Sequence, residues 1–241
     1  MNILVAIDDT DSPDEGATGH LAEEISVEIA SRGVGKASRI TRHQLLVHPS
    51  IPYTAHNSSM AFYVTASGLE GVYGIASSVL ESKSTSGSDP GLCLVDVESI
   101  NDWQRRELVE FGREAKRSVL NKEEAYSTAA RLGVRLSEHG GTGGGVIGAL
   151  AGAGLRLSGN DGRFRGWLDG SCGTVKVADL LVMQGIDEVR AYRAHDLLGS
   201  DEDVEIEGRM KTVLLGNRAV LLVYREGGVW KNCLKEQLKD Y

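Results

Sequence analysis

The sequence predicts an α/β (α+β) protein. A ferredoxin-like, split β-α-β N-terminal lobe is followed by a helical, glycine-rich segment and a second, smaller α+β lobe. Three observations predict this class. Short apolar runs and helically spaced segments alternate in the order β-α-β-β-α-β at the start of the chain. Two more helical segments and a run of glycines come next, and the rest of the chain is mainly strand-like.

The N-terminal lobe opens with an apolar run at residues 2–8 that ends in an acid, as is typical of a buried central strand. A helix is predicted over residues 18–31, because Leu21, Ile25 and Ile29 recur at helical spacing, and Gly33 ends it. The other expected elements of this part are strands at residues 39–47, 60–66 and 92–97, and a helix at residues 72–80.

The middle of the chain predicts helices over residues 102–120 and 122–132. Asn121 caps the start of the second helix and Gly133 ends it. The remaining expected elements are strands at residues 134–136, 164–168, 189–192 and 219–224, and helices at residues 146–155 and 175–183. A change in character at residues 159–162 marks a lobe boundary. We therefore expect an ATP- and Mg-binding, kinase-like lobe at 1–158 and a second α+β lobe, related to the ferredoxin-like fold, at 159–241.

Composition narrows the function classes. The 241 residues carry a formal net charge of −8, which argues against a free-standing nucleic-acid binder but leaves a local basic groove open. The most apolar run, residues 143–155, is shorter than a membrane span, and no cationic leader opens the chain. Three widely spaced cysteines predict neither a structural zinc site nor a disulfide framework. We expect a cytoplasmic protein with no membrane partner.

The most informative motif is the acidic cluster at the end of the first predicted strand. Asp8, Asp9 and Asp11 repel one another unless a hard cation lies among them, and their oxygens suit Mg²⁺ beside the phosphates of ATP. These three are the predicted metal ligands and catalytic acids, and Thr10 and Ser12 are assigned to nucleotide binding. The alternative is a simple turn in which Asp8 caps a backbone amide.

A glycine-rich run lies immediately ahead of the predicted helix at residues 146–155. Glycines let the backbone approach an anion closely, and the N–H groups of a helix start favour phosphate. The candidate phosphate-binding residues are Gly141, Thr142, Gly143, Gly144 and Gly145. The alternatives are a flexible turn, or close helix packing through small residues such as Gly148 and Gly152. No Lys-Ser or Lys-Thr follows the glycines, so this is not a Walker A loop.

Thr18 stands at the expected start of the first helix. Its hydroxyl serves either as a helix cap or as the acceptor of a phosphoryl group. His43, His48 and His56 flank a loop that contains Pro49 and Pro52. A histidine there could contact a nucleotide or act as an acid or base, although most such residues are ordinary surface groups.

Four motifs together resemble one archaeal family, the isoleucine-tRNA 2-agmatinylcytidine synthetases, which use ATP to attach agmatine to a wobble cytidine. The motifs are IDDTDS at residues 7–12, Gly16-Ala17-Thr18, the stretch from His43 to Pro52, and EHGGTGGGVIGALAGAG from Glu138. The resemblance implies that Asp8, Asp9 and Asp11 hold Mg²⁺ for ATP and that Thr18 is the threonine which the family phosphorylates. It also places His56, Asn57 and Gly143 to Gly145 near the nucleotide.

The chain departs from the family at several points. Ala17-Thr18-Gly19 replaces the usual Cys-Thr-Thr, and His56 replaces a glycine. In these 241 residues we expect no counterpart of the OB-fold and zinc ribbon with which the family grips tRNA. We expect an ATP- and Mg-dependent phosphoryl- or nucleotidyl-transfer enzyme, ligase-like or kinase-like, that activates an oxygen for attack by an amine. The alternatives are a nucleotide-binding regulatory module without turnover, and a catalytic subunit acting on tRNA with separate RNA-binding partners. The second substrate, the ATP bond that breaks and the oligomeric state, a homodimer included, stay open.

Overall fold

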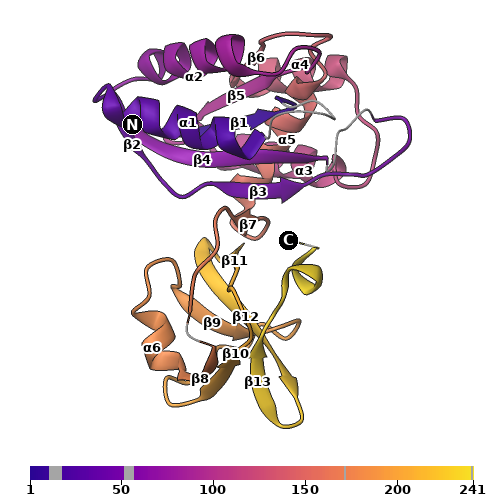
Figure 1. Ribbon diagram of the computed structural model, residues 1–241. Helices are drawn as coiled ribbons and strands as arrows, with labels where there is room; N and C mark the ends of the chain where they lie inside the picture. Colours follow the sequence, from indigo (N-terminus) through magenta and orange to yellow (C-terminus); the bar gives the residue numbers. More distant parts are fainter. Residues whose placement is uncertain (11–17, 52–56, 171, 240) are drawn as a thin grey trace. The chain divides into compact units, whose positions relative to one another are not determined.

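The computed structural model describes residues 1–10, 18–51, 57–170, 172–239 and 241 (Figure 1). The chain divides into two compact units, Met1–Ser158 and Gly159–Tyr241. Each unit has its own apolar clusters, so each is described by itself.

The first unit is built on one antiparallel sheet. Its strands are β1 (Asn2–Asp8), β2 (Gly35–Ala37), β3 (Thr41–Gln44), β4 (Ser58–Ala66), β5 (Gly91–Asp96) and β6 (Arg135–Glu138). Its helices are α1 (Thr18–Ser31), α2 (Leu69–Lys83), α3 (Asp102–Glu114), α4 (Lys122–Leu132) and α5 (Gly145–Ser158). The strand order is β6-β5-β1-β4-β3, with β2 also paired to β4. Because β4 lies between β1 and β3, and β1 between β4 and β5, both β-α-β connections are split.

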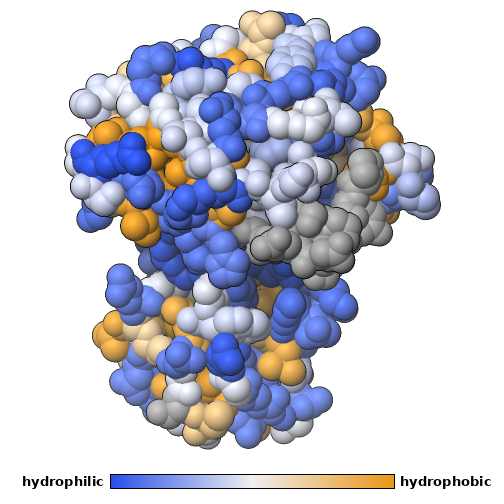
Figure 2. Space-filling model, turned by 45° about the horizontal axis from the view of Figure 1, so that its top comes forward, coloured by the Kyte–Doolittle hydropathy of each residue, from blue (hydrophilic) through white to orange (hydrophobic). Residues whose placement is uncertain are grey.

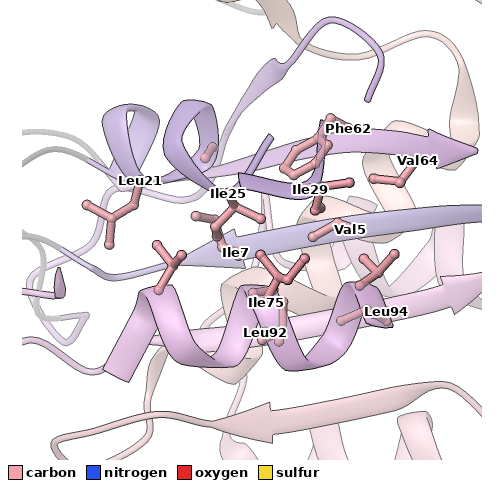
Figure 3. Close-up of a cluster of buried hydrophobic side chains, with 14 of the residues drawn as sticks. Val5, Ile7, Leu21, Ile25, Ile29, Phe62, Val64, Ile75, Leu92 and Leu94 are labelled. Carbon is pink, nitrogen blue, oxygen red and sulfur yellow. The ribbon is translucent and has the colours of Figure 1, made fainter. Parts of the chain in front are cut away.

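Helices cover both faces of this sheet. On β1, Val5 and Ile7 point to the face covered by α1 and α2 (Figure 3), and Ile3 belongs to the same apolar cluster. The intervening Leu4 and Ala6 belong to the cluster formed with α3, α4 and α5. Every apolar position of β1 is therefore buried, which explains its continuous apolar run. The same alternation places Asp8, the last residue of β1, on the α5 face.

Glycines bring α5 close to its neighbours. A Cβ on Gly154 would overlap the carbonyl oxygen of Leu108 in α3, and a Cβ on Gly152 would overlap the Oγ of Ser59 in β4. Gly112 of α3 also lies close to the backbone of α5, since a Cβ there would be 2.7 Å from the Ala151 carbonyl oxygen. The small-residue packing that the sequence offered as an alternative role for this segment is thus confirmed for Gly152.

Local signals set several element ends. Asn121 caps α4 in a capping box with Glu124, and Gly133 ends it in the left-handed conformation at φ 64°, both as predicted. The helix expected over residues 102–120 was predicted too long, because α3 ends at Glu114. Tighter turns follow, and the carbonyl oxygen of Ala115 accepts the N–H of Leu46 at 3.2 Å.

The second unit is mainly β-structure. Its elements are β7 (Arg163–Phe164), β8 (Gly173–Lys176), α6 (Val177–Leu181), β9 (Glu188–Ala191), β10 (Asp203–Ile206), β11 (Thr212–Leu215), β12 (Arg218–Glu226), β13 (Val229–Asn232) and the 3-10 helix η1 (Lys235–Leu238). The strand order is β7-β11-β12-β13-β10-β8, and β9 also pairs with β12. The helix expected over residues 175–183 was wrong at its start, since Val175 pairs with Val204 of β10 and only Val177–Leu181 is helical.

The surface agrees with the charged composition. The face shown in Figure 2 is covered largely by hydrophilic side chains, with smaller groups of hydrophobic ones between them. Among the helices that the structure describes, none is long and apolar enough to span a membrane.

Candidate functional site

Strand register gathers polar residues at one end of the first sheet. Asp8 at the end of β1 pairs with Gly91 at the start of β5, and Gly91 also pairs with Glu138 at the end of β6. Asp89 lies two residues before Gly91. We call the group Asp8, Asp9, Asp89 and Glu138 the polar edge. It brings the acidic motif and the glycine-rich run of the sequence to the same place.

Asp8 is buried, with 7% of its surface exposed. Its carboxylate lies against the first turn of α5, where a Cβ on Gly148 would overlap Asp8 Oδ2. The start of a helix carries partial positive charge, which stabilises an anion. Glycine at position 148 thus makes room for a buried carboxylate. Close packing through small residues, the alternative role predicted for this segment, is thus confirmed for Gly148 as well. The side chain that packs against Gly148 is Asp8, the first acid of the predicted motif.

Asp9 and Thr10 turn the chain away from the sheet. Asp9 has φ 53°, in the left-handed region that residues other than glycine seldom adopt, and such conformations gather at functional sites. Thr10 is fully buried, and its carbonyl oxygen accepts both the N–H and the Oγ1–H of Thr85 at 3.1 Å. Within the described residues, the buried Oγ1 of Thr10 makes no hydrogen bond. It is a buried polar atom that could take a ligand as its partner.

The glycine-rich run forms a loop around the carboxylate of Asp89. Both the backbone N–H and the hydroxyl of Thr142 donate hydrogen bonds to that carboxylate. Gly141 and Gly143 have φ values of 56° and 77°, which favour glycine. Gly145, the first residue of α5, donates its N–H to the Asp89 carbonyl oxygen at 3.0 Å. Two of the amides proposed for phosphate therefore already have protein acceptors.

The other side of the loop is held by Glu138. Lys122 forms an ion pair with Glu138 at 2.8 Å, and the Tyr126 hydroxyl donates to the same oxygen at 2.7 Å. These hydrogen bonds, from Lys122 first and then Tyr126, lower the pKa of Glu138 below its usual value. Burial, together with the Glu138 carboxylate, raises the pKa of Tyr126 to about 12. Gly143 lies so close that a Cβ there would overlap the Glu138 carboxylate.

The remaining predicted site residues differ in position. Thr18 is the first residue of α1 and is buried. Asn57 holds the ends of its own loop together, because its Nδ2 donates to the Leu46 carbonyl at 2.7 Å and its carbonyl accepts the Leu45 N–H at 2.9 Å. Asp11, Ser12 and His56 lie outside the described residues.

The predicted metal site is described only in part. Within residues 1–10, 18–51, 57–170, 172–239 and 241, no three His, Cys, Asp or Glu side chains are grouped so that they could hold a metal ion. Asp8 and Asp9 are two acidic oxygen donors at a strand end, a donor type that suits Mg²⁺. The third acid of the motif, Asp11, is not among the described residues.

Sequence reasoning gave no role to Asp89, Glu138 or Lys122. Asp89 stands directly before Pro90-Gly91 and a predicted strand. An acid just ahead of a strand was therefore the sequence feature that could have identified it as a candidate site residue. Glu138 lies in the quoted motif, but its contacts depend on the register between β5 and β6. Lys122 reaches the loop from α4, twenty residues earlier in the chain.

The comparisons with known proteins agree with this architecture. No protein-family model matches the sequence. The uncharacterized protein MJ0921 of Methanocaldococcus jannaschii is 29% identical over 156 residues, covering 64% of this chain and 49% of that protein. A solved structure of a tRNA fluorescent labeling enzyme is 28% identical with a TM-score of 0.55, covering 64% of this chain and 36% of the other.

Solved structures of TiaS, a tRNA agmatidine synthetase, also resemble this chain. The complex of TiaS with its tRNA and ATP gives a TM-score of 0.56 at 23% identity, over 82% of this chain and 48% of TiaS. The complex of TiaS with its tRNA, AMPCPP and agmatine gives 0.55 at 20% identity, over 91% and 52%. The resemblance predicted from the motifs is thus confirmed at the level of the fold. The chain spans about half the length of TiaS and of MJ0921.

Proposed function

We propose that this chain is an ATP-dependent enzyme that activates an oxygen of a second substrate for attack by an amine. The observation that carries the proposal is the polar edge, where the acids at the end of β1 meet a glycine loop at the start of α5. The structural likeness to TiaS, crystallised with ATP and with agmatine, supports it. We assign ATP binding to residues 1–158, with the second unit as a smaller α+β lobe.

The residues present fit a magnesium ion in the chemistry of their donors. Asp8, Asp9 and Asp11 would hold it. The buried Thr10 hydroxyl makes no hydrogen bond within the described residues, so it could bind a ligand oxygen. When bound, the ion would neutralise charge on the phosphates. Thr18 and the amides of Gly143 and Gly144 would orient the nucleotide, whereas Thr142, predicted as a nucleotide-binding residue, would hold the loop through its hydrogen bonds to Asp89.

The chain's own groups would act mainly by alignment and charge. The loop amides and the start of α5 favour negative oxygens, and Thr18 is the proposed phosphate acceptor or phosphate-binding hydroxyl. Because phosphoryl and nucleotidyl transfer depend on positioning and electrostatic stabilisation, no strongly activated nucleophile is needed. The amine would then form its bond to the second substrate as the activated oxygen leaves together with the phosphoryl or nucleotidyl group that it received from ATP.

Product analysis tests the proposal. The protein is incubated with Mg-ATP, with and without agmatine and tRNA, and ADP, AMP, phosphate and pyrophosphate are separated by chromatography. We expect nucleotide cleavage that increases with the second substrate and falls in the Asp8→Asn variant. Binding of ATP with no cleavage under any condition would instead support a nucleotide-binding module.

An RNA substrate is the second candidate, favoured by the tRNA in the TiaS complexes. The net charge of −8 means that any RNA contact needs a local basic surface or a partner subunit. A gel shift with tRNA whose affinity falls steeply with salt would support direct binding. Absence of a shift at low salt would exclude direct tRNA binding by this chain without a partner.

A further inference from the structure

Lys122 occupies an unusual place for a cation. It is the first residue of α4, where the helix dipole disfavours positive charge. That end is already stabilised by the Asn121–Glu124 capping box and by Glu123 in the first turn. The needs of the helix start therefore do not explain a lysine at this position.

The ammonium group of Lys122 reaches the glycine loop. Its Nζ donates to the carbonyl oxygen of Thr142 at 2.6 Å and lies 2.8 Å from Glu138 Oε1. Tyr126, one turn further along α4, binds the same Glu138 oxygen. The loop is thus held by Asp89 through Thr142 on one side, and by Lys122 and Glu138 on the other.

A phosphate bound in the glycine loop would need a cation nearby. Asp89 and Glu138 both lie against its glycines, so a phosphate entering the loop would meet two carboxylates. The described loop residues from His139 to Gly145 include no Lys or Arg. An ammonium has three N–H donors, and that of Lys122 contacts two acceptors, which leaves one donor for a phosphate oxygen.

We infer that Lys122 is the cation that contacts the nucleotide's phosphates in this site. A Walker A loop carries its phosphate-binding lysine within its own motif, whereas here the lysine comes from the first turn of α4. The inference rests on the proposed function, because it names a residue for the same ATP site. Glu138 keeps the ammonium near the loop and occupies one of its donors, and the glutamine of Glu138→Gln can still accept that hydrogen bond.

Calorimetric titration with adenosine, AMP, ATP and tripolyphosphate tests the inference. The proteins are the wild type, Lys122→Met, Glu138→Gln and a control, Lys36→Met, whose lysine is exposed on β2. Thermal unfolding checks that each variant is folded. We expect Lys122→Met to weaken ATP and tripolyphosphate about 10- to 100-fold, as for loss of a charge-assisted hydrogen bond, and to leave adenosine unchanged. Lys36→Met should match the wild type.

Glu138→Gln separates phosphate contact from loop support. If Lys122 contacts phosphate, removing the Glu138 charge should leave ATP affinity unchanged or raise it. The inference is overturned, and the ATP site is not, if Lys122→Met binds ATP as tightly as the wild type. The same holds if this variant loses equal affinity for adenosine and for ATP. Equal weakening of ATP by Glu138→Gln and Lys122→Met also overturns it, since Lys122 would then act only through the ion pair. A wild type that binds neither ATP nor tripolyphosphate overturns the proposed function itself.

Discussion

Gly148 of α5 and Asp8 of β1 fit together so closely that any side chain at position 148 would overlap the Asp8 carboxylate. The contact links a helix-packing residue to the first acid of the candidate site. The position of Asp8 therefore depends on a glycine that has no chemistry of its own.

Replacing Gly148 with alanine should destabilise the protein and displace Asp8. Overpacking of this kind typically lowers the free energy of unfolding by about 1–3 kcal/mol. Gly74 in α2 is a matched control, because nothing lies within 4 Å of the position that a Cβ would take there. Gly74→Ala should raise stability by about 0.5–1 kcal/mol, since alanine suits a helix better. Urea unfolding of both variants is the measurement, and a Gly148→Ala protein as stable as Gly74→Ala would contradict the contact.

Gly154→Ala should be more damaging to stability than Gly148→Ala. The obstacle at Gly154 is the backbone carbonyl of Leu108, which cannot rotate away as a side chain can. We expect a loss of about 3 kcal/mol or more in unfolding free energy, at the upper end for overpacked sites. Urea unfolding should rank Gly154→Ala below Gly148→Ala, and the opposite order would argue against close α3–α5 packing.

Tyr126 should lose its proton only at high pH, and it should stabilise the fold while it is protonated. Its pKa is raised from 10.0 to about 12 by burial and by Glu138. A raised pKa in the folded state means that the stabilisation is fully present below about pH 10 and is lost as the pH rises towards about 12. The absorbance difference between wild type and Tyr126→Phe should titrate near pH 12. A midpoint at the ordinary tyrosine value would show that the phenol lacks these contacts.

The cysteines should differ in reactivity. Cys172 is exposed, while burial raises the pKa of Cys93 and of Cys233 to about 12. Because the thiolate is the reactive form, Ellman's reagent should modify Cys172 in the native protein and all three thiols only after unfolding. Cys172→Ser should then be unreactive when folded. Rapid reaction of that variant would mean that a buried cysteine is accessible.

Local signals made much of the fold predictable. Helical spacing and end residues placed α1 and α4 correctly, because apolar period, caps and terminal glycines act within one segment. The apolar run of β1 identified the central strand for the same reason. The end of α3 was missed because tight turns continue from it, with the N–H groups of Lys116 and Arg117 bonded three residues back, and no glycine or proline marks residues 113–120.

The candidate site was predictable only as separate motifs. The acids at the end of β1 and the glycines before α5 are visible in sequence, and the strand register brings them together. The roles of Asp89 and Lys122 depend on their contacts with Thr142, which is 53 residues after Asp89 and 20 residues after Lys122. Contacts at such separations cannot be predicted from the spacing of residues within one helix or strand. The metal ligands, Thr18 as phosphate acceptor and Asn57 in a nucleotide pocket stay predictions.

Calorimetric titration of Mg-ATP into the wild type, Asp8→Asn and Asp96→Asn measures the central claim most directly. Asp96 is a matched control, because it ends β5 at the opposite end of the sheet and its carboxylate accepts the Glu98 N–H at 3.1 Å. We predict that Asp8→Asn weakens Mg-ATP binding by about tenfold or more while Asp96→Asn binds like the wild type. Equal affinity for Mg-ATP in all three proteins would contradict an ATP site at the polar edge.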